Sequence, residues 1–340
     1  MRGGRRTPKK LGLAVWATEP LPVVVEQVKL AESIGFDSVW VIDSQLICRD
    51  VFVTLAALAA NTTTIALATG VTQPTTRHPA VTASALAALE ELGGARIMAG
   101  MGTGFSSLRT LGLPAARMAE FERFVDTVRR LLACEPARLD NGFEARMTWP
   151  AQPARIPIFG AASGPKMTRL VARIADGAIL LQGISDTLLD RAMAWLAEGR
   201  AESRHKADGF QVACWAPFGL GDDAEGALDQ VRVRVASAAM NARPEWFEGD
   251  ERSAVEALQA GYGDYDHAAA QAGHAHALPQ GVIDRYAIAG TPGMVRERLS
   301  ALMQRDDLDH VILTPQASAD DRMDLSDLLR RLDRDVLTGL

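Results

Sequence analysis

Short apolar runs alternate with longer helical patterns along this chain, and this alternation constrains the fold more than any other feature. The run Ser38–Ile42 (SVWVI), apolar after its first residue, is typical of a strand buried on both faces of a parallel sheet. Comparable runs predict eight strands, at Leu11–Trp16, Ser38–Ile42, Ile65–Gly70, Arg96–Met101, Ile156–Ala161, Gly177–Leu181, Gln211–Phe218 and His310–Thr314. This order predicts an α/β fold, the (β/α)8 TIM barrel, with a doubly wound sheet as its rival.

The helical patterns carry apolar residues three and four positions apart, such as Val24, Val28 and Ala31. They predict helices at about Leu21–Ile34, Val51–Ala60, Ala80–Leu92, Ala119–Leu132, Lys166–Ile174 and Leu188–Glu198. The stretch from Ala224 to Ile288 departs from the rhythm, because it is helical at first and loop-like over Gly261–Leu278. We therefore expect one domain over residues 1–340, in which the 224–288 insertion forms a lid over the barrel mouth before the last strand.

Composition and charge exclude several classes of protein. Hydrophobic residues make up 48% of the chain, which is enough apolar side chain to exclude a disordered protein. With 36 Lys and Arg against 42 Asp and Glu, the net charge of −6 argues against nucleic acid as a partner. No window approaches the roughly 20 apolar residues of a membrane span, so we expect no membrane partner.

Cysteine, histidine and the amino-terminal residues indicate the compartment. The basic run MRGGRRTPKK precedes an apolar stretch, Leu11–Ala17, that is short for a secretory signal and has no small-residue cleavage site, so we interpret it as a solvated tail. Cys48, Cys134 and Cys214 form no C-x-x-C pair, which fits a reduced, cytoplasmic protein. The histidines, including His274 and His276, lack metal-ligand spacing, and we expect no metal.

Three glycine-containing motifs follow predicted strands. Gly100-Met-Gly102-Thr103-Gly104 has Phe105 where the dinucleotide fingerprint needs its third glycine, which argues against that fingerprint. Gly160-Ala-Ala-Ser163-Gly164-Pro165-Lys166-Met167 opens a helix, where amides and a hydroxyl bind an anion or simply cap the helix.

The third motif is Thr69-Gly70-Val71-Thr72-Gln73-Pro74, followed by Arg77-His78-Pro79. Its glycine permits a close approach of the backbone to a flat ligand, whereas an ordinary turn would leave Arg77 solvated and His78 packed. Asp43-Ser44-Gln45 closes the second strand, so that Asp43 either faces the barrel mouth or caps the next helix.

Taken in this order, the motifs resemble those of the bacterial-luciferase-like superfamily of flavin and deazaflavin enzymes. The block TGVTQPTTRHPAVTASALAALEELGGAR, together with RDVFVTL (49–55), GAASGPKM and IADGAILL (174–181), is similar to the methylenetetrahydromethanopterin reductase branch. The resemblance covers about residues 11–182 well and the last strand loosely. It implies a (β/α)8 barrel that holds coenzyme F420, or alternatively FMN, at the carboxyl ends of its strands.

The resemblance also implies site residues. It places a non-proline cis peptide at Gly70–Val71, as a bulge behind the tricyclic ring, and Asp43 beside the ring. The cofactor-binding residues that it implies are Asp43, Gly70, Val71, Thr72, Gly102, Thr103, Ser163, Gly164, Pro165, Lys166, Gln182 and Gly183. Ser163 to Lys166 would hold the ribityl-phosphate region, with Gln182 and Gly183 nearby.

The chain departs from these relatives at two positions that handle protons. Ser44 stands where many F420 relatives have histidine, and Phe105 where many have a carboxylate. Solvent, Glu19, Arg49 or His78 would then protonate the substrate. The candidate catalytic residues are therefore Ser44, Arg49 and His78, none of them decisive.

Three functions remain open. The first is an F420-dependent reductase of a C=C or C=N bond in a small or peptidic metabolite. The second is an FMN-dependent monooxygenase with a separate flavin reductase as partner, and the third is a non-catalytic flavin-binding subunit. Relatives are usually homodimers or homotetramers, and we expect the same here.

Overall fold

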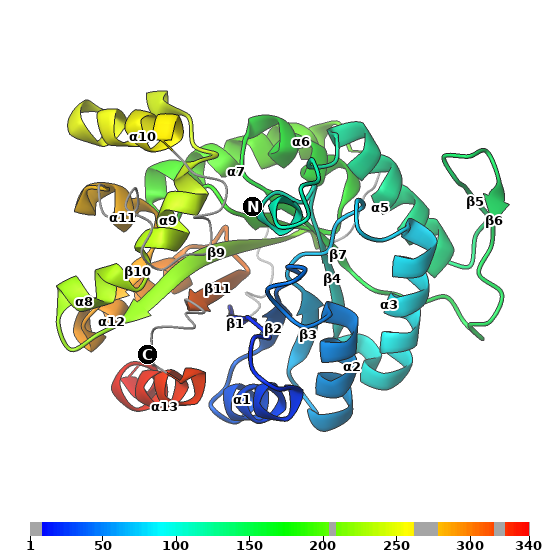
Figure 1. The fold of residues 1–340 in the computed structure, drawn as a ribbon, viewed down its shortest axis with the longest axis horizontal. Coiled ribbons are helices and arrows are strands. Elements are labelled where there is room, and N and C mark those ends of the chain that lie inside the picture. Colours follow the sequence, from blue (N-terminus) through cyan, green and yellow to red (C-terminus); the bar gives the residue numbers. More distant parts are fainter. Residues whose placement is uncertain (1–8, 204–208, 262–277, 316–323, 340) are drawn as a thin grey trace, which may run out of the picture.

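The strands of the protein close into a parallel barrel surrounded by helices (Figure 1). A computed structural model describes residues 9–203, 209–261, 278–315 and 324–339. The sheet runs in the order β9-β11-β1-β2-β3-β4-β7-β8, and β8 pairs again with β9. That last pairing closes the sheet, so the predicted (β/α)8 barrel is confirmed and the doubly wound rival is excluded.

The elements occur in the predicted alternation. The barrel strands are β1 (Lys10–Val15), β2 (Ser38–Val41), β3 (Ala66–Thr69), β4 (Ile97–Met101), β7 (Ile158–Ala162), β8 (Gly177–Leu180), β9 (Gln211–Leu220) and β11 (His310–Pro315). The helices between them are α1 (Leu21–Ser33), α2 (Val51–Asn61), α3 (Pro79–Gly93), α4 (Ser106–Arg109), α5 (Met118–Leu132), α6 (Pro165–Ile174), α7 (Asp186–Ala201), α12 (Pro292–Gln304) and α13 (Leu325–Asp335).

A column of aromatic side chains fills the barrel interior. Trp40 of β2 is fully buried, and its ring centroid lies 5.4 Å from that of Phe159 and 6.4 Å from that of Trp215. Small residues on neighbouring strands make room for the indole. At Gly100, for example, a Cβ would lie 2.1 Å from the Thr69 carbonyl oxygen and 3.2 Å from Trp40 Cζ3. The column plugs the barrel below its carboxyl-terminal mouth, and thereby defines the floor of any site there.

A hydrophobic core separate from that of the barrel packs the helices of the insertion against one side of the barrel. Residues 224–288 contain α8 (Ala224–Asp229), α9 (Arg232–Ala239), α10 (Gly249–Gly261), α11 (Gln280–Tyr286) and a short strand, β10 (Ile288–Gly290). Their apolar side chains form a cluster of their own around Phe247 and Tyr286. β10 pairs in parallel with the end of β9, a strand that the sequence analysis did not predict.

The antiparallel pair β5 (Ala137–Arg138) and β6 (Glu144–Ala145) was also not predicted, and it extends away from the barrel in Figure 1. Residues 1–8, which hold most of the basic amino-terminal run, lie outside the described residues. So do residues 262–277, with His274, His276 and most of the stretch expected to be loop-like.

Candidate active site

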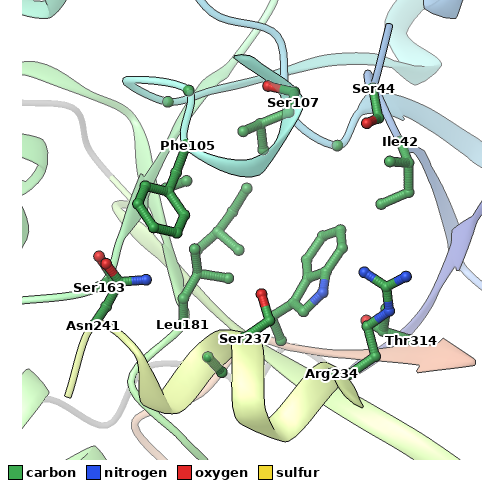
Figure 2. A pocket seen from close by; sticks show the side chains of 18 of the residues that line it. Ile42, Ser44, Phe105, Ser107, Ser163, Leu181, Arg234, Ser237, Asn241 and Thr314 are labelled. Carbon is green, nitrogen blue, oxygen red and sulfur yellow. The ribbon is translucent and has the colours of Figure 1, made fainter. Parts of the chain in front are cut away.

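A cavity of about 320 Å³ opens at the carboxyl ends of the barrel strands (Figure 2). Barrel strands, the loops that follow them and α9 contribute its walls, which are largely apolar. The lining residues are Trp16, Ile42, Asp43, Ser44, Gly70, Val71, Gly102, Thr103, Gly104, Phe105, Ser107, Ala115, Ala161, Ser163, Met167, Ile179, Leu181, Trp215, Pro217, Arg234, Ser237, Ala238, Asn241, Tyr286 and Thr314. Cofactor and substrate sites of TIM barrels lie at this end.

The floor of the cavity is formed by the backbone that follows β3. The Gly70–Val71 peptide bond is cis, as the resemblance implies. The Gly70 amide donates to the Val41 carbonyl at 2.7 Å, and the Thr72 amide donates to the Gly100 carbonyl at 3.0 Å. A side chain at Gly70 would meet Trp40 and Trp215 at 3.1 and 3.2 Å. This stretch is therefore fixed from below by the barrel core, and it presents Val71 to the cavity.

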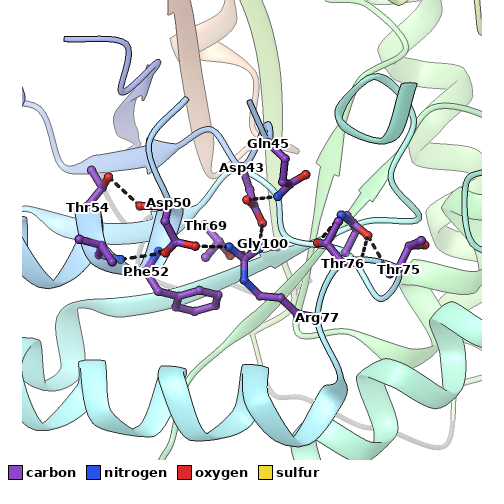
Figure 3. Close-up of polar contacts among 12 residues, drawn as sticks. Asp43, Gln45, Asp50, Phe52, Thr54, Thr69, Thr75, Thr76, Arg77 and Gly100 are labelled. Atoms are coloured by element: carbon purple, nitrogen blue, oxygen red, sulfur yellow. Dashed lines mark hydrogen bonds and ion pairs between the residues drawn. The ribbon is translucent and has the colours of Figure 1, made fainter. Parts of the chain in front are cut away.

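Asp43, at the end of β2, lies beside this floor and is held by an ion-pair network (Figure 3). Arg77 Nη1 donates to Asp43 Oδ2 at 2.7 Å, and Arg77 Nη2 donates to Asp50 Oδ2 at 2.6 Å. Gln45 Nε2 donates to the other oxygen of Asp43 at 2.7 Å. Burial raises the pKa of Asp43, and the positive charge of Arg77 opposes that shift. Arg77 is thus largely buried rather than solvated, with its side chain 14% exposed.

The amino terminus of α6 adjoins the cavity on the opposite side from Arg234 in Figure 2. Gly164 is the N-cap residue and provides no side-chain hydrogen bond, and the first turn holds no acidic residue. Ser163 and Met167, on either side of the cap, both line the cavity. Uncapped amides at the positive end of a helix dipole, next to a hydroxyl, form a suitable place for a phosphate group.

One wall of the cavity carries polar groups from α9 and the residues that follow it, and in Figure 2 they run from Asn241, beside Ser163, to Arg234 at the other end. Arg234 and Ser237 of α9, and Asn241 beyond it, recur at helical spacing and face the cavity. Figure 2 shows Arg234 and Thr314 at the end away from Ser163. The Arg234 guanidinium carbon lies 4.0 Å from the centroid of the Trp16 ring.

The cavity brings together part of the predicted site. Of the predicted residues, those that line it are Asp43, Ser44, Gly70, Val71, Gly102, Thr103 and Ser163. Those that lie beside it without lining it are Thr72, Gly164, Pro165, Lys166, Gln182 and Gly183. That all of them hold a cofactor stays a prediction.

Two of these neighbours, Gln182 and Lys166, have evident roles outside the cavity. The Gln182 amide donates to Thr168 Oγ1 at 2.9 Å and accepts from the Leu181 amide at 3.0 Å. Gln182 therefore anchors the loop after β8. Lys166 is exposed in the first turn of α6, where its charge extends the positive end of that helix.

The candidate proton donors other than Ser44 lie outside the cavity. Arg49 donates to the carbonyls of Ala17 and Thr18 at 3.2 and 2.5 Å, and so joins two loops. His78 is exposed rather than packed, and its Nδ1 accepts from the Ala80 amide at the start of α3. Glu19 is exposed as well. Phe105, which the resemblance places where many relatives have a carboxylate, does line the cavity.

Trp16, Arg234, Tyr286 and Thr314 also line the cavity, and none of them was a predicted site residue. Trp16 and Thr314 could have been found, because each ends a predicted strand at the mouth of the barrel. The recurrence of Arg234, Ser237 and Asn241 at helical spacing was a further signal. Tyr286 had no local signal.

The described parts of the chain hold neither a cluster of metal-ligating side chains nor a helix suited to span a membrane. No three His, Cys, Asp or Glu side chains among those residues converge as metal ligands would. None of the helices described there is both long and apolar enough to cross a membrane.

Comparison with known proteins identifies the family. The luciferase-like monooxygenase family matches residues 1–309. The 5,10-methylenetetrahydromethanopterin reductase of Archaeoglobus fulgidus is 31% identical over 288 residues, covering 81% of this chain and 84% of that protein. The enzyme of the same name from Methanolobus tindarius is 29% identical over 300 residues, covering 86% of this chain and 90% of that protein.

A solved structure agrees with these relatives. The coenzyme F420-dependent tetrahydromethanopterin reductase of Methanopyrus kandleri superimposes with a TM-score of 0.77 at 20% identity, over 98% of this chain and 99% of that one. At that identity the superposition supports the fold, while the family match and the sequence relatives carry the assignment. The chain therefore belongs to the luciferase-like family of oxidoreductases, in the neighbourhood of the methylenetetrahydromethanopterin reductases that its motifs resemble.

Proposed function

We propose that the protein is an F420-dependent reductase, which transfers a hydride from the reduced deazaflavin to a C=C or C=N bond of a small or peptidic metabolite. The observation that carries the proposal is the cavity itself. It joins an apolar chamber, lined by Val71, Leu181 and Trp215, to the uncapped amino terminus of α6. A tricyclic ring with a phosphate-bearing tail needs both features, and relatives named for F420 or for methanopterin reduction share most of this chain.

The residues present fit such a cofactor. Val71 and Gly102 provide a narrow floor, because a Cβ at Gly102 would lie 3.0 Å from Val71 Cγ2 and 3.4 Å from Ala161 Cβ. Leu181 and Met167 would contact the ring, and Ser163 with the amides that follow it would bind the phosphate. When bound, the reduced cofactor supplies the hydride.

In this reaction the chain would orient the reactants, exclude water from them and place a charged group beside them. Trp215 and Pro217 cover apolar surface beside the floor, which would exclude water from the reacting atoms. Asp43 is the sole carboxylate among the described residues that line the cavity, and Arg77 fixes its orientation. With Ser44 and Phe105 at the two positions where relatives handle protons, we propose that solvent provides the proton to the reduced substrate.

The alternative cofactor is FMN, in a monooxygenase that receives reduced flavin from a separate reductase. The name of the family, luciferase-like monooxygenase, supports it. The two cofactors share a tricyclic core and a ribityl phosphate, so the same cavity suits both. The proposed homodimeric or homotetrameric state is common to both functions.

A direct binding experiment separates the two cofactors. We expect purified protein to quench or polarise the fluorescence of F420 more strongly than that of FMN. We also expect it to oxidise reduced F420 with an unsaturated substrate at the same rate in air and under nitrogen. Oxygen consumption with reduced FMN, and no binding of F420, would reject the proposal in favour of the monooxygenase.

Two glycine variants locate the ring. Gly102→Leu places a branched side chain against Val71 and Ala161, and so should abolish cofactor binding. Gly293→Ala is the matched control, because no atom lies within 4 Å of a Cβ at that outer-helix position. Equal cofactor affinity in the two variants would show that the ring does not rest on this floor.

A further inference from the structure

Two hydrogen-bonding groups of the cavity wall have no partner among the described residues. Trp16 Nε1 and Thr314 Oγ1 are both buried, and no described residue accepts from them or donates to them. Both residues line the cavity, and Thr314 is only 3% exposed. Buried polar groups of folded proteins nearly always have a hydrogen-bond partner, so two such groups around one cavity indicate that a ligand completes them.

The register of the barrel places these two groups side by side. In the parallel pairing of β1 with β11, Leu13 lies opposite Leu313. Trp16, just beyond β1, and Ile312 of β11 both pack in the apolar cluster inside the barrel. Because side chains alternate along a strand, Thr314, two residues after Ile312, also faces inward, on the strand next to the one that leads to Trp16.

The strand on the other side of β1 adds a third polar group. β2 pairs with β1, and Ser44 follows two residues after Ile42, which faces the barrel interior. Ser44 is 7% exposed and lines the cavity. Figure 2 shows Ser44 and Thr314 on one side of the cavity and Ser163 on the other. Trp16, Ser44 and Thr314, from three neighbouring strand ends, are called the donor wall below.

The donor wall lies across the barrel from α6. In the closed sheet, β1 is four strands away from β7 in either direction. α6 begins directly after β7, and its amino terminus is the place proposed above for the cofactor phosphate. The donor wall is therefore separated from the tail of the cofactor by the full width of the cavity, which leaves it to the substrate.

The chemistry of the donor wall favours an uncharged hydrogen-bond acceptor. An indole N–H can only donate, and serine and threonine hydroxyls donate to any strong acceptor. The Arg234 guanidinium carbon lies 4.0 Å from the centroid of the Trp16 ring, and this packing fixes the direction of the indole N–H. The three groups of the wall are themselves neutral, and a carbonyl oxygen costs far less to bury than an ionised group does.

We infer that Trp16, Ser44 and Thr314 bind the carbonyl oxygen of the substrate. The substrate class, which rests on the function proposed above, is then an α,β-unsaturated carbonyl compound, because a carbonyl group in conjugation is what makes a C=C bond accept a hydride. The hydride supplied by the reduced cofactor forms a C–H bond at the β-carbon, and the π electrons of the C=C bond shift toward the carbonyl oxygen. Solvent then provides the proton that the α-carbon takes up. Hydrogen bonds to this oxygen strengthen as its negative charge develops.

The binding test uses two probes of the same shape. Acetophenone carries a carbonyl oxygen, and α-methylstyrene has a methylene group in its place. In ligand-observed NMR titrations of the full chain, we expect acetophenone to bind at least about fivefold more tightly than α-methylstyrene, which is the worth of two neutral hydrogen bonds. The preference should persist after F420 is added, because the donor wall lies away from α6. We expect benzoate, as a third probe, to bind more weakly than acetophenone.

Thr314→Val removes the hydroxyl at nearly constant volume and should lower the preference for acetophenone severalfold. Trp16→Phe, which keeps an aromatic ring without the N–H, should do the same, and it serves as the second variant if Thr314→Val does not fold. Thr82→Val is the matched control. Thr82 Oγ1 is also buried without a described partner, but it lies in α3 and does not line the cavity. Thermal unfolding checks that each variant is folded.

Equal affinity for acetophenone and α-methylstyrene would overturn the inference, as would a Thr314→Val variant that binds acetophenone as tightly as Thr82→Val does. Benzoate binding tighter than acetophenone binding would assign the donor wall to an anion instead. Loss of the preference on addition of F420 would assign the wall to the cofactor.

Turnover tests the substrate class. With reduced F420, we expect reduction of the C=C bond of benzylideneacetone and none of β-methylstyrene, which lacks the carbonyl group. Equal turnover of the two, or turnover of neither, would overturn the class. Cofactor fluorescence in the same samples keeps the two proposals apart. F420 binding without a preference for acetophenone rejects the donor wall alone, and the reverse result supports the wall while rejecting the F420-dependent function.

Discussion

Replacement of Arg77 by methionine should destabilise the protein in a strongly pH-dependent way. Arg77 contacts Asp43 at 2.7 Å, and the two side chains are 14% and 3% exposed. At an effective dielectric constant of about 20, a contact of this length is worth roughly 6 kcal/mol of attraction. Without Arg77, the Asp43 carboxylate would remain buried beside the cavity with Gln45 as its main partner.

The actual loss is limited because the carboxyl group can take up a proton instead. Protonating a carboxyl of ordinary pKa 3.8 costs about 4 kcal/mol at pH 7 and about 1.6 kcal/mol at pH 5. The variant should therefore lose up to about 4 kcal/mol of unfolding free energy at pH 7, and no more than about 1.6 kcal/mol at pH 5. The sign follows from the charge, since only the ionised carboxylate needs the guanidinium.

Urea unfolding followed by circular dichroism at the two pH values measures this difference. The double variant Asp43→Asn, Arg77→Met should recover most of the loss at pH 7, because no charge is left buried. Arg330→Met is the control, since its ion pair with Asp327 has both side chains at least 62% exposed, and it should stay within about 0.5 kcal/mol. An equal loss at both pH values, or a double variant no more stable than the single one, would refute the reasoning.

Three other changes test the barrel and the site. Burial lowers the pKa of His310 to about 4, so the unfolded chain binds a proton that the folded protein does not between about pH 6.5 and 4. The free energy of unfolding should fall by up to about 3 kcal/mol as the pH drops through that window. In urea titrations, His310→Gln should remove this part of the pH dependence, and an unchanged pH dependence would contradict the prediction. Gly70→Val should push Trp215 into the cavity. Cofactor binding should weaken at least about tenfold, for a loss of about 1–3 kcal/mol in the free energy of unfolding. Normal binding would show that the cofactor ring lies elsewhere. Lys166→Ala should weaken cofactor binding at low salt and less at high salt, because the exposed charge of Lys166 acts through the solvent. A dissociation constant that is unchanged at low salt would place the cofactor phosphate away from α6.

The agreement between the predicted and observed strands has a local cause. A strand buried on both faces needs consecutive apolar residues, as in Ser38–Ile42, and that requirement is written into the chain itself. The same holds for the start of α6, where Pro165 suits the first helical turn. The cis peptide at Gly70 was expected because the surrounding motif resembles a family, and no periodicity would have revealed it.

Contacts between distant residues were beyond such patterns. Arg77 and Asp43 meet only because β2 and the loop after β3 end at the same edge of the barrel. The weak apolar signal of Ile288–Gly290 left β10 undetected, since a three-residue strand depends on its pairing with β9 rather than on its own sequence. Gln182, whose place near the cofactor stays a prediction, makes hydrogen bonds with Thr168 and the Leu181 amide that no local pattern indicated.

The sequence by itself determined the alternation of strands and helices, the family, and the motifs that form one half of the cavity. It did so because burial periodicity, helix caps and glycine positions act within a few residues of chain. Only the tertiary structure decided that the sheet closes, and that Trp16, Arg234, Tyr286 and Thr314 line one cavity at the mouth of the barrel. Those four residues come from the loop after β1, from α9, from α11 and from β11, and the free energy that places them around one cavity belongs to the packed barrel and its insertion rather than to any one segment.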